Sequence, residues 1–300
     1  MARFSSEKTD RDIAKRQAAN VMKVLQVTAI RSVGTVRNYQ AALTRIALYF
    51  RANGGVNLQD ITPEMAIQYF HSRAASVGQK SLDMERQALL AMMIHLTQVL
   101  PDGQTLTVVR SLHEQSLSSR SYTTEQIEVI ASHQSDKNRL ATRIAYNAGL
   151  RSHELFSLCE WRYREPSARP ASGKKFLGRG GVSYTVQGKG GLVREIKLAA
   201  ELAEILESRR LAEPVTVTDR GIHYQQYYAI SAGQSWSRSF SNASTRALGW
   251  SAGSHGTRHS YAQERMAELQ DCGCSYDESL EVVSQEMGHF RAEITKTYLR

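Results

Sequence analysis

The stretch "GGVSYTVQGKGGLVREIKL", residues 180–198, differs in pattern from the rest of the chain. Alternating side chains over residues 182–187, and again over 192–198, are typical of half-buried β-strands. The "GKGG" between them supplies glycines for a turn that needs positive φ angles, so the stretch is predicted to be a β-hairpin. Most of the flanking sequence has helical periodicity. The sequence therefore predicts a mainly α protein that carries one small antiparallel sheet.

The sequence well before this hairpin is helical by its periodicity. Apolar spacing predicts four helices, over residues 7–27, 35–55, 60–74 and 81–100. Thr62 and Pro63 suit the start of the third helix, as an N-cap and a first helical residue whose missing N–H costs nothing. The serine-rich "HEQSLSSRSYTTEQ" then interrupts the pattern. We therefore predict a helical domain over 1–112 with a basic helix over 1–28, a linker over 113–123, and a second domain over 124–300.

Helical patterns return in the predicted second domain. Thr124 is expected to cap its first helix, and a second helix is expected to end at Gly149, a residue suited to the left-handed position after a helix. Beyond the hairpin, helices are predicted over residues 199–210, 235–248, 256–270, 276–287 and 291–299. The second domain is therefore predicted to be mixed but mostly α, with the hairpin as its small sheet.

The charge balance points to an anionic partner. The chain has 300 residues, a hydrophobic content of 41% and a formal net charge of +9. Residues 1–112 hold 14 Lys and Arg against 8 Asp and Glu, whereas residues 113–300 hold 24 against 21. An excess of Lys and Arg attracts polyanions and binds phosphates by releasing counterions. The smaller first domain is thus the more basic and is expected to contact a phosphate backbone.

Cysteine usage and the absence of long apolar segments suggest the compartment. Three cysteines, Cys159, Cys272 and Cys274, are too few for a disulfide framework in a chain of this length, which indicates a reducing compartment. The start "MARFSSEKTDRD" lacks the apolar stretch of a signal peptide, and no 18-residue apolar run follows. We therefore expect a soluble cytoplasmic protein with no membrane partner.

Four short stretches carry residues capable of chemistry. They supply Arg151 and Glu154 from "GLRSHEL", Lys189 from "QGKGG", His255 and Arg258 from "SHGTRHSYAQERM", and His289 and Tyr298 from "GHFRAEITKTY". Each alone has an ordinary structural explanation, such as a surface arginine or a solvated loop lysine. Their meaning therefore depends on their order along the chain.

Metal sites are disfavoured by the same sequence. His255 and His259 are four apart on a predicted helix, but a metallohydrolase of that type needs a glutamate after the first histidine, and Gly256 stands there. Cys272 and Cys274 form half of a possible metal site, and no second cysteine pair completes it. No metal site is predicted.

Taken in order, the candidate residues resemble those of the tyrosine recombinases, the family of phage integrases and Xer-type resolvases. The resemblance runs from about residue 30 to the end, and six positions agree in type, order and context. It implies a helical core-binding domain followed by a catalytic domain. It also implies double-stranded DNA recombination sites as partners, self-association as a tetramer on DNA, accessory directionality proteins, a place at the bacterial nucleoid, and no cofactor.

The resemblance implies a covalent mechanism. Tyr298 is the expected nucleophile, which conserves the phosphodiester bond energy in a 3′-phosphotyrosine link while the 5′ oxygen leaves. Arg151 and Arg258 are expected to clamp the non-bridging oxygens, because a guanidinium donates bidentate, charge-assisted bonds to phosphate. A phenol has a pKa of about 10, so the site must stabilise developing charge for the attack to proceed.

The remaining residues are implied as proton carriers and supports. Lys189 is expected to protonate the leaving 5′ oxygen from the hairpin turn. His255 is expected to accept the tyrosine proton or hold the phosphate, and His289 to bind the phosphate from the opposite side. Glu154 is expected to orient the site. Lys174 and Lys175 are rival candidates for the lysine role, although they precede "FLGRGG" and do not lie between two strands.

Two features depart from the family pattern. His289 follows His255 by 34 positions, about ten more than in compact members, and we expect the extra residues to form a longer loop that includes Cys272 and Cys274. Only Leu299 and Arg300 follow Tyr298. Either a longer tail belongs to the natural protein, or protomers couple through another surface such as the helix over residues 7–27.

Two other functions stay open from the sequence. A type IB topoisomerase uses a similar constellation but relaxes supercoils without exchanging strands between duplexes. A catalytically idle DNA-binding or architectural protein could keep the scaffold. The intact six positions and the helical domain in front favour a site-specific recombinase that integrates or excises a mobile element.

Overall fold

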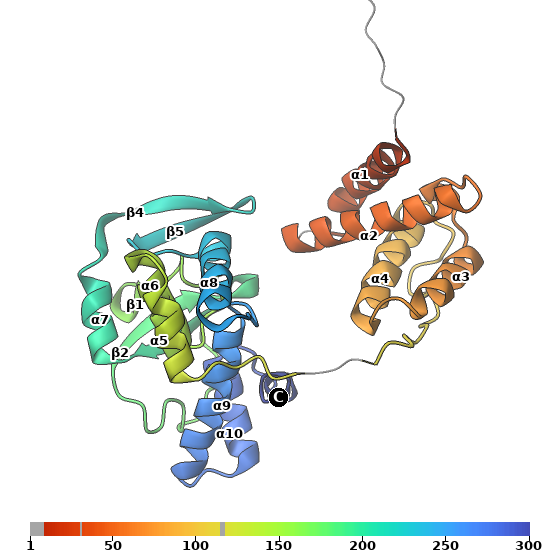
Figure 1. The fold of residues 1–300 in the computed structure, drawn as a ribbon. Coiled ribbons are helices and arrows are strands. Elements are labelled where there is room, and N and C mark those ends of the chain that lie inside the picture. The colour runs from red at the N-terminus through yellow and green to blue at the C-terminus, as the bar shows by residue number, and fades with distance from the viewer. Residues whose placement is uncertain (1–8, 31, 115–117) are drawn as a thin grey trace, which may run out of the picture. The chain divides into compact units, whose positions relative to one another are not determined.

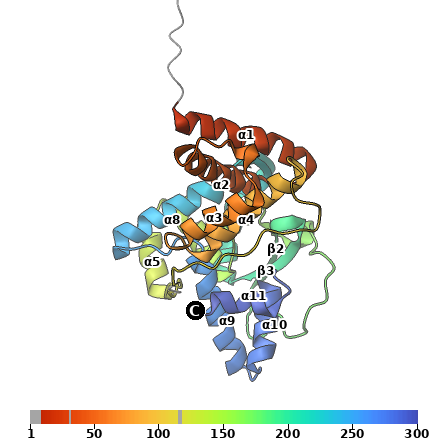
Figure 2. The same ribbon diagram turned by 90° about the vertical axis from the view of Figure 1, so that its right-hand side faces the viewer.

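The computed structural model describes residues 9–30, 32–114 and 118–300 and is drawn in two views in Figure 1 and Figure 2. The chain divides into two compact units, Met1–Ser116 and Leu117–Arg300, here called unit 1 and unit 2. Residues 7 and 8 of the first predicted helix, and residues 115–117 of the predicted linker, lie outside the described residues. Each unit has its own core and is considered by itself.

Unit 1 is helical, as predicted. Its elements are α1 (Asp10–Thr28), α2 (Val33–Ala52), the 3₁₀ turn η1 (Leu58–Asp60), α3 (Pro63–Ala74) and α4 (Gln79–His95). The predicted start of α3 is confirmed, because the Thr62 hydroxyl accepts a hydrogen bond from the Met65 N–H at 3.3 Å and Pro63 is the first helical residue. The predicted helix to residue 100 is wrong at its end: Gln98 has a φ of +55°, which a continuing helix cannot accommodate.

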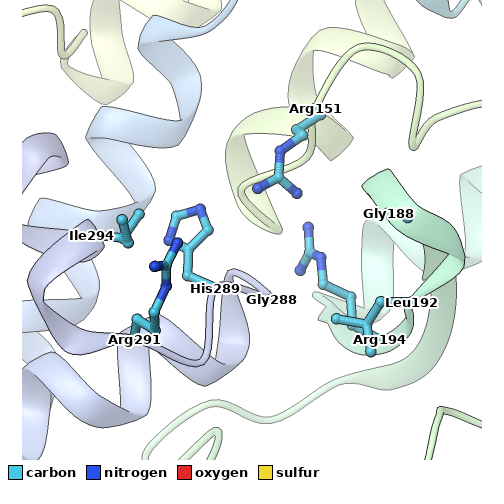
Figure 3. Close-up of a pocket in the computed structure, with 9 residues that line it drawn as sticks. Arg151, Gly188, Leu192, Arg194, Gly288, His289, Arg291 and Ile294 are labelled. Atoms are coloured by element: carbon cyan, nitrogen blue, oxygen red, sulfur yellow. The ribbon is translucent and has the colours of Figure 1, made fainter. Parts of the chain in front are cut away.

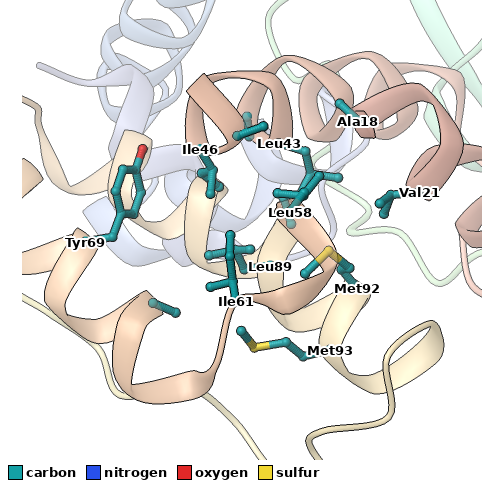
Figure 4. Packing of buried hydrophobic residues seen from close by; sticks show 14 of the residues in the cluster. Ala18, Val21, Leu43, Ile46, Leu58, Ile61, Tyr69, Leu89, Met92 and Met93 are labelled. Atoms are coloured by element: carbon teal, nitrogen blue, oxygen red, sulfur yellow. The ribbon is translucent and has the colours of Figure 1, made fainter. Parts of the chain in front are cut away.

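The core of unit 1 combines aliphatic packing with one buried carboxylate. Figure 4 shows Leu43, Ile46 and Leu89 among the fully buried side chains that fill the space between the helices. Each such side chain contributes about 1.5–3 kcal/mol when removed from water. Glu85 is also fully buried and accepts hydrogen bonds from the Tyr69 hydroxyl at 2.9 Å and from arginine side chains of α2 and α3. The core therefore contains a satisfied ionic cluster.

Unit 2 is mostly helical around two small sheets. Its helices are α5 (Thr124–Ser132), α6 (Asp136–Asn147), α7 (Ala200–Glu207), α8 (Gly233–Leu248), α9 (Gly256–Asp271), α10 (Tyr276–Glu286) and α11 (Ala292–Thr295). Its strands are β1 (Cys159–Glu160), β2 (Val182–Gln187), β3 (Val193–Leu198), β4 (Arg210–Asp219) and β5 (Ile222–Tyr228). The 3₁₀ turns are η2 (Trp161–Tyr163), η3 (Lys189–Gly191) and η4 (Lys296–Tyr298). The mainly α fold class is therefore confirmed.

The predicted hairpin is the centre of the first sheet. Strands β1, β2 and β3 are antiparallel in that order, and β2 pairs with β3 from Val182 opposite Leu198 to Gln187 opposite Val193. The turn η3 has Gly190 at φ +80° and Gly191 at φ +84°, the left-handed conformations that favour glycine. Lys189 thus lies at the tip of the hairpin, as predicted.

A second sheet was not predicted. Strands β4 and β5 form an antiparallel ribbon, drawn apart from the first sheet in Figure 1, in a region to which no element was assigned from the sequence. The middle of β4 is exposed on both faces, and Pro214 and a register shift interrupt it. Without a buried face, the alternation that marks a strand is confined to residues 215–218.

One further prediction is corrected by one position: Thr123, not Thr124, caps α5, in a capping box with Gln126.

Helices α9 and α10 pack against each other, and α10 contacts α11 (Figure 2). The predicted longer loop between them is wrong, because α9 and α10 take up most of the extra residues and only the turn 272–275 separates them. Cys272 and Cys274 are free thiols in this turn. The predicted helix over 291–299 is also wrong in part: α11 is a single turn that is followed by the 3₁₀ turn η4.

A buried ion pair locks α9 to α10. The Arg265 guanidinium donates to both carboxylate oxygens of Glu286 at 2.9 Å, and neither side chain is exposed. The Tyr261 hydroxyl and the Phe176 N–H donate to the same carboxylate at 2.8 Å. Because every carboxylate oxygen is hydrogen-bonded, the charge is compensated where water cannot reach it. This pair fixes the helix that leads into the His289 turn.

Candidate active site

The first candidate residues follow the end of α6. Gly149 has a φ of +59°, and a Cβ there would lie 2.7 Å from the Tyr261 ring, so only glycine fits this turn. Two residues later, the Arg151 N–H donates to Glu154 Oε2 at 2.8 Å and the Arg151 guanidinium donates to Glu154 Oε1 at 2.7 Å. The turn therefore places Arg151 directly over the Glu154 carboxylate.

Glu154 is the negative centre of an arginine cluster. It is fully buried and accepts a hydrogen bond from Arg194 Nη2 at 2.8 Å, while Arg258 Nη1 lies 3.7 Å away. Burial alone would raise the pKa of Glu154, but the charges of Arg194, Arg258 and Arg151 outweigh it and hold that pKa well below its usual range. Three guanidinium groups around one carboxylate leave an excess of positive charge. The cluster is therefore suited to bind an anion.

Arg258 comes from the first turn of α9 and is fully buried. Its Nη1 donates to the Gly149 carbonyl, and its Nη2 donates to the Met287 carbonyl at 3.2 Å and lies 3.1 Å from His289 Nε2. Burial and the charge of Arg151 lower the pKa of Arg258 to about 10, so the guanidinium stays charged at neutral pH. Arg258 thus joins the α6 turn to the His289 turn.

His255 stands just before α9, as its N-cap residue. The helix begins at Gly256, and His255 and Arg258 both face the Tyr298 ring, whose centre lies 5.6 Å from the His255 ring centre and 5.5 Å from the Arg258 guanidinium carbon. Burial of the His255 ring and the charge of Arg258 lower its pKa, although the residue keeps an exposed edge where solvent screens part of this effect. His255 is expected to be neutral at neutral pH.

His289 lies in a tight turn after α10. Gly288 and Phe290 on either side have φ values of +73° and +53°. Ser284 holds this turn: its carbonyl accepts from the His289 N–H at 2.9 Å, and its hydroxyl accepts from the Arg291 N–H at 2.8 Å. Burial and the charge of Arg258 lower the pKa of His289 to about 3, so its imidazole is neutral. An arginine N–H facing Nε2 then places the ring proton on Nδ1.

Tyr298 is buried among these residues. The centre of its ring lies 4.9 Å from that of His259, 5.2 Å from that of His289 and 5.6 Å from that of His255. The Arg258 guanidinium carbon lies 5.5 Å from the ring centre, within cation–π range. The backbone of the segment is tied to α9, because Gln263 Nε2 donates to the carbonyls of Tyr298 at 3.1 Å and Arg300 at 3.2 Å.

A cavity of about 400 Å³ opens beside this cluster. In Figure 3, Arg151 and Arg194 face it from one side and His289 and Arg291 from the other. Among the predicted residues, Arg151 and His289 line the cavity, whereas Arg258, His255 and Tyr298 pack against one another without lining it. Ile294 also lines the cavity and packs against the apolar cluster that contains Tyr298.

Lys189 is placed only by its backbone. Gly188 and Gly190 on either side of it line the cavity, so the turn that carries Lys189 borders the site. The Lys189 side chain lies outside the described residues. The rival lysines are engaged elsewhere, since Lys174 Nζ lies 2.7 Å from Glu278 and Lys175 Nζ 3.4 Å from Glu195.

Sequence reasoning missed Arg194 and Arg291, which both line the cavity. The signal for Arg194 was available: β3 alternates, and Arg194 shares the buried face of the strand with Ile196 and Leu198. An arginine on the inward face of a strand requires a buried acceptor. No comparable signal marks Arg291, which is an exposed residue next to a turn.

Metal binding and membrane insertion are two alternative roles for the side chains and helices of this protein. In the described ranges, no group of three or more His, Cys, Asp or Glu side chains is arranged to hold a metal ion. None of the helices in these ranges is both long and apolar enough to span a membrane. The absence of a cofactor stays a prediction.

No protein-family model and no curated protein matches the sequence. Solved structures do match. XerH site-specific recombinase in a post-cleavage complex with palindromic difH substrate is 16% identical with a TM-score of 0.59, over 100% of this chain and 87% of that chain. A lambda integrase tetramer bound to a Holliday junction is 17% identical with a TM-score of 0.60, over 94% of this chain and 76% of that chain. Tn1549 transposon integrase in complex with transposon right end DNA is 15% identical with a TM-score of 0.55, over 96% of this chain and 94% of that chain. This chain therefore has the fold of the tyrosine recombinases, as its resemblance to that family predicted.

Proposed function

We propose that this protein is a tyrosine recombinase, which cleaves and rejoins DNA strands at specific sites through a 3′-phosphotyrosine intermediate. The observation that carries the proposal is the convergence of Arg151, Arg258, His289 and Tyr298, which come from three separate stretches of the sequence. The likeness in fold to a recombinase bound to its DNA substrate supports it. The expected partners are double-stranded DNA sites and further copies of the chain.

The arginine cluster would receive the scissile phosphate. Its excess positive charge borders a cavity, and the Arg151 side chain keeps 23% of its surface exposed there. The guanidinium of Arg151 is thus the one that an entering phosphate meets. Removal of one donor that acts on developing charge costs roughly 2.7–4 kcal/mol, which is a hundredfold or more in rate.

Tyr298 would then attack the phosphorus. Its O–P bond forms as the bond from phosphorus to the 5′ oxygen breaks, His255 takes the phenol proton, and Lys189 gives a proton to the leaving oxygen. In the structure the Tyr298 ring covers the buried Arg258 guanidinium. We infer that the ring shifts when the phosphate enters, so that Arg258 and His289 can contact the non-bridging oxygens.

Unit 1 would hold the DNA beside the catalytic unit. Its basic charge supports this assignment, as does the presence of DNA in the complexes with the same fold. By analogy with the lambda integrase tetramer on a Holliday junction, four copies would act together. Integration or excision of a mobile element is the biological role that fits such an activity, with accessory proteins setting its direction.

A trapping experiment tests the proposal. A nicked suicide substrate, built from DNA that the protein is first shown to bind selectively, loses the strand end needed for religation, so the covalent adduct accumulates. Tyr298→Phe should form no adduct while it binds the DNA as the wild type does. Arg151→Ala should bind within a few-fold and form adduct at least roughly a hundredfold more slowly.

Two results would contradict the proposal. A covalent adduct that persists in Tyr298→Phe would exclude this residue as the nucleophile. Efficient relaxation of plasmids that lack any specific site, without recombinants, would assign a topoisomerase activity instead.

A further inference from the structure

We propose that Arg194 is a positioning residue that fixes the Lys189 turn against Glu154 and against the end of α10. This inference rests on the proposed function, in which Lys189 protonates the leaving oxygen. Arg194 follows Lys189 by five residues on the same hairpin. The position of Arg194 can therefore determine the position of the turn and of the proton donor that the turn carries.

The Arg194 guanidinium bridges two segments that are distant in sequence. Its Nη2 donates to Glu154 Oε2 at 2.8 Å and to the Gly149 carbonyl at 3.3 Å, and its Nη1 donates to the Glu286 carbonyl at 2.6 Å. Only 3% of the side chain is exposed. Arg194 lines the cavity, but both of its terminal nitrogens are occupied by protein acceptors, so it serves the frame of the site. Arg151 is the more exposed of the two, at 23% against 3%.

The other strand of the hairpin is tied to the same segment. The Gln187 N–H donates to the Ser157 hydroxyl at 2.9 Å, three residues after Glu154. Between the two ties, the turn closes through a hydrogen bond from the Gly188 N–H to the Leu192 carbonyl at 2.7 Å. The base of the Lys189 turn is therefore held on both strands: β2 is tied through Gln187 to Ser157, and β3 is tied through Arg194 to Glu154.

The hairpin passes close to the carboxylate and to the His289 turn. A Cβ on Gly188 would lie 3.4 Å from Glu154 Oε1, an ordinary contact distance, so the hairpin backbone runs beside the carboxylate without requiring glycine there. A Cβ on Gly288 would lie 2.8 Å from Arg194 Cδ, so the aliphatic part of Arg194 packs on the turn that carries His289. Arg194 thus contacts the Glu154 carboxylate and the His289 turn from the hairpin, and it fixes the positions of all three relative to one another.

Loss of Arg194 should therefore impair proton donation more than phosphate binding. Glu154 would keep Arg151 and Arg258, whereas the hairpin would lose its tie on β3. A lysine at this position keeps the charge but presents a single ammonium on a flexible stem, which does not reproduce the planar fork that spans Glu154 and Glu286. Arg194→Lys should accordingly rescue only part of the defect of Arg194→Met.

The test uses a substrate whose leaving group needs no proton. Sulfur replaces the 5′ bridging oxygen at the scissile phosphate, so attack by Tyr298 forms the O–P bond and breaks the P–S bond. The sulfur then leaves with the electron pair as a thiolate, because a thiol has a pKa of only about 8.5. Cleavage of this substrate is insensitive to the proton donor and sensitive to the phosphate clamp.

On the oxygen substrate, Arg194→Met should cleave at least roughly tenfold more slowly than the wild type. Lys189→Ala should cleave roughly a hundredfold more slowly, because it lacks the general acid itself. On the sulfur substrate, both variants should return to within a few-fold of the wild type, whereas Arg151→Ala should stay slow. Circular dichroism and DNA binding verify that each variant is folded. If Arg194→Met does not fold, Arg194→Lys takes its place in the same comparison.

The outcomes separate this inference from the proposed function. If the Arg194 variants stay slow on the sulfur substrate, as Arg151→Ala does, the positioning role is overturned and Arg194 acts on the phosphate or on the fold alone. If Lys189→Ala is not rescued while the Arg194 variants are, the lysine assignment fails and Arg194 positions a different proton donor.

Discussion

Each unit of this protein buries a glutamate that two or more arginines contact, Glu85 in unit 1 and Glu154 in unit 2, and the two clusters differ in what surrounds the arginines. Glu85 in unit 1 bonds to Arg45 and Arg73, whose side chains are 48% and 26% exposed. Glu154 in unit 2 bonds to Arg194, which is almost fully buried, and to Arg151, which faces a cavity. A fully buried third arginine stands behind them. The same residue types thus form two different electrostatic environments.

The two clusters differ in how well solvent screens the positive charge of their guanidinium groups. Around Glu85 the guanidinium groups reach solvent, so water and salt screen the charge that the carboxylate does not neutralise. Around Glu154 most of the guanidinium surface is shielded, and the uncompensated charge is directed at the cavity. The first arrangement ties three helices together, and the second presents positive charge to a cavity, where the proposed function would seat a phosphate. Variants of the two glutamates test this distinction.

Glu154→Gln should have the largest effect, on both stability and cleavage. It leaves buried guanidinium groups without their counter-charge, and breaking a buried pair in this way costs about 3–5 kcal/mol. Glu85→Gln should cost less, about 1–3 kcal/mol, because its arginines can turn to water and the Tyr69 hydroxyl can still donate to the amide oxygen. Only Glu154→Gln should slow adduct formation at saturating DNA.

The unfolding of the two units can be followed by separate spectroscopic signals. All three tryptophans, Trp161, Trp236 and Trp250, belong to unit 2. In denaturant unfolding, Glu154→Gln should shift the transition seen by tryptophan fluorescence, and Glu85→Gln should shift only a component seen by far-ultraviolet circular dichroism. A loss of cleavage in Glu85→Gln with wild-type DNA binding would remove the distinction between the clusters.

The histidines around Tyr298 should make unit 2 sensitive to acid. Burial first, and the charge of Arg120 second, lower the pKa of His259 to about 4. Below its ordinary pKa of about 6.5, the unfolded chain binds a proton at this residue that the folded chain does not bind until about pH 4. The free energy of unfolding therefore falls as the pH drops through this window, by at most about 1.4 kcal/mol per pH unit.

His259→Gln should flatten that slope between pH 6.5 and 4. The measurement is the tryptophan-reported unfolding transition at a series of pH values, for wild type and variant. The circular dichroism component of unit 1 should keep its slope, because the substitution lies in unit 2. An unchanged tryptophan slope in the variant would mean that His259 binds its proton equally well in both states.

The order of motifs along the sequence was sufficient to name residues that the fold brings together. Arg151, Arg258, His289 and Tyr298 have side-chain types that phosphoryl transfer requires, so their choice did not depend on knowing the fold. Arg194 could not be selected that way, because its importance comes from a buried strand face and from acceptors that lie 40 and 92 positions away. Motifs therefore reveal residues whose side-chain type suits a reaction more readily than residues whose importance depends on the buried partners that the fold brings to them.

The fold was predictable to a similar extent. The hairpin and most helices follow from local periodicity, which burial of one face imposes on the sequence. The β4–β5 ribbon escaped prediction because the middle of β4 has no buried face. The longer loop was predicted wrongly because a spacing between two motifs gives a number of residues and not their conformation, whereas the helices predicted over 256–270 and 276–287 already left only a short turn between them.

Arg45→Met should have the smallest effect of the changes considered. Arg45 Nε donates to Glu85 at 3.0 Å, but nearly half of its side chain is exposed, and an ion pair of that kind contributes about 0–1 kcal/mol. Arg73 and Tyr69 keep the carboxylate hydrogen-bonded in this variant. The circular dichroism component of unit 1 should therefore shift by less than about 1 kcal/mol. A loss as large as that of Glu154→Gln would show that water does not substitute for protein partners at Glu85, and the two clusters would then be one kind of site.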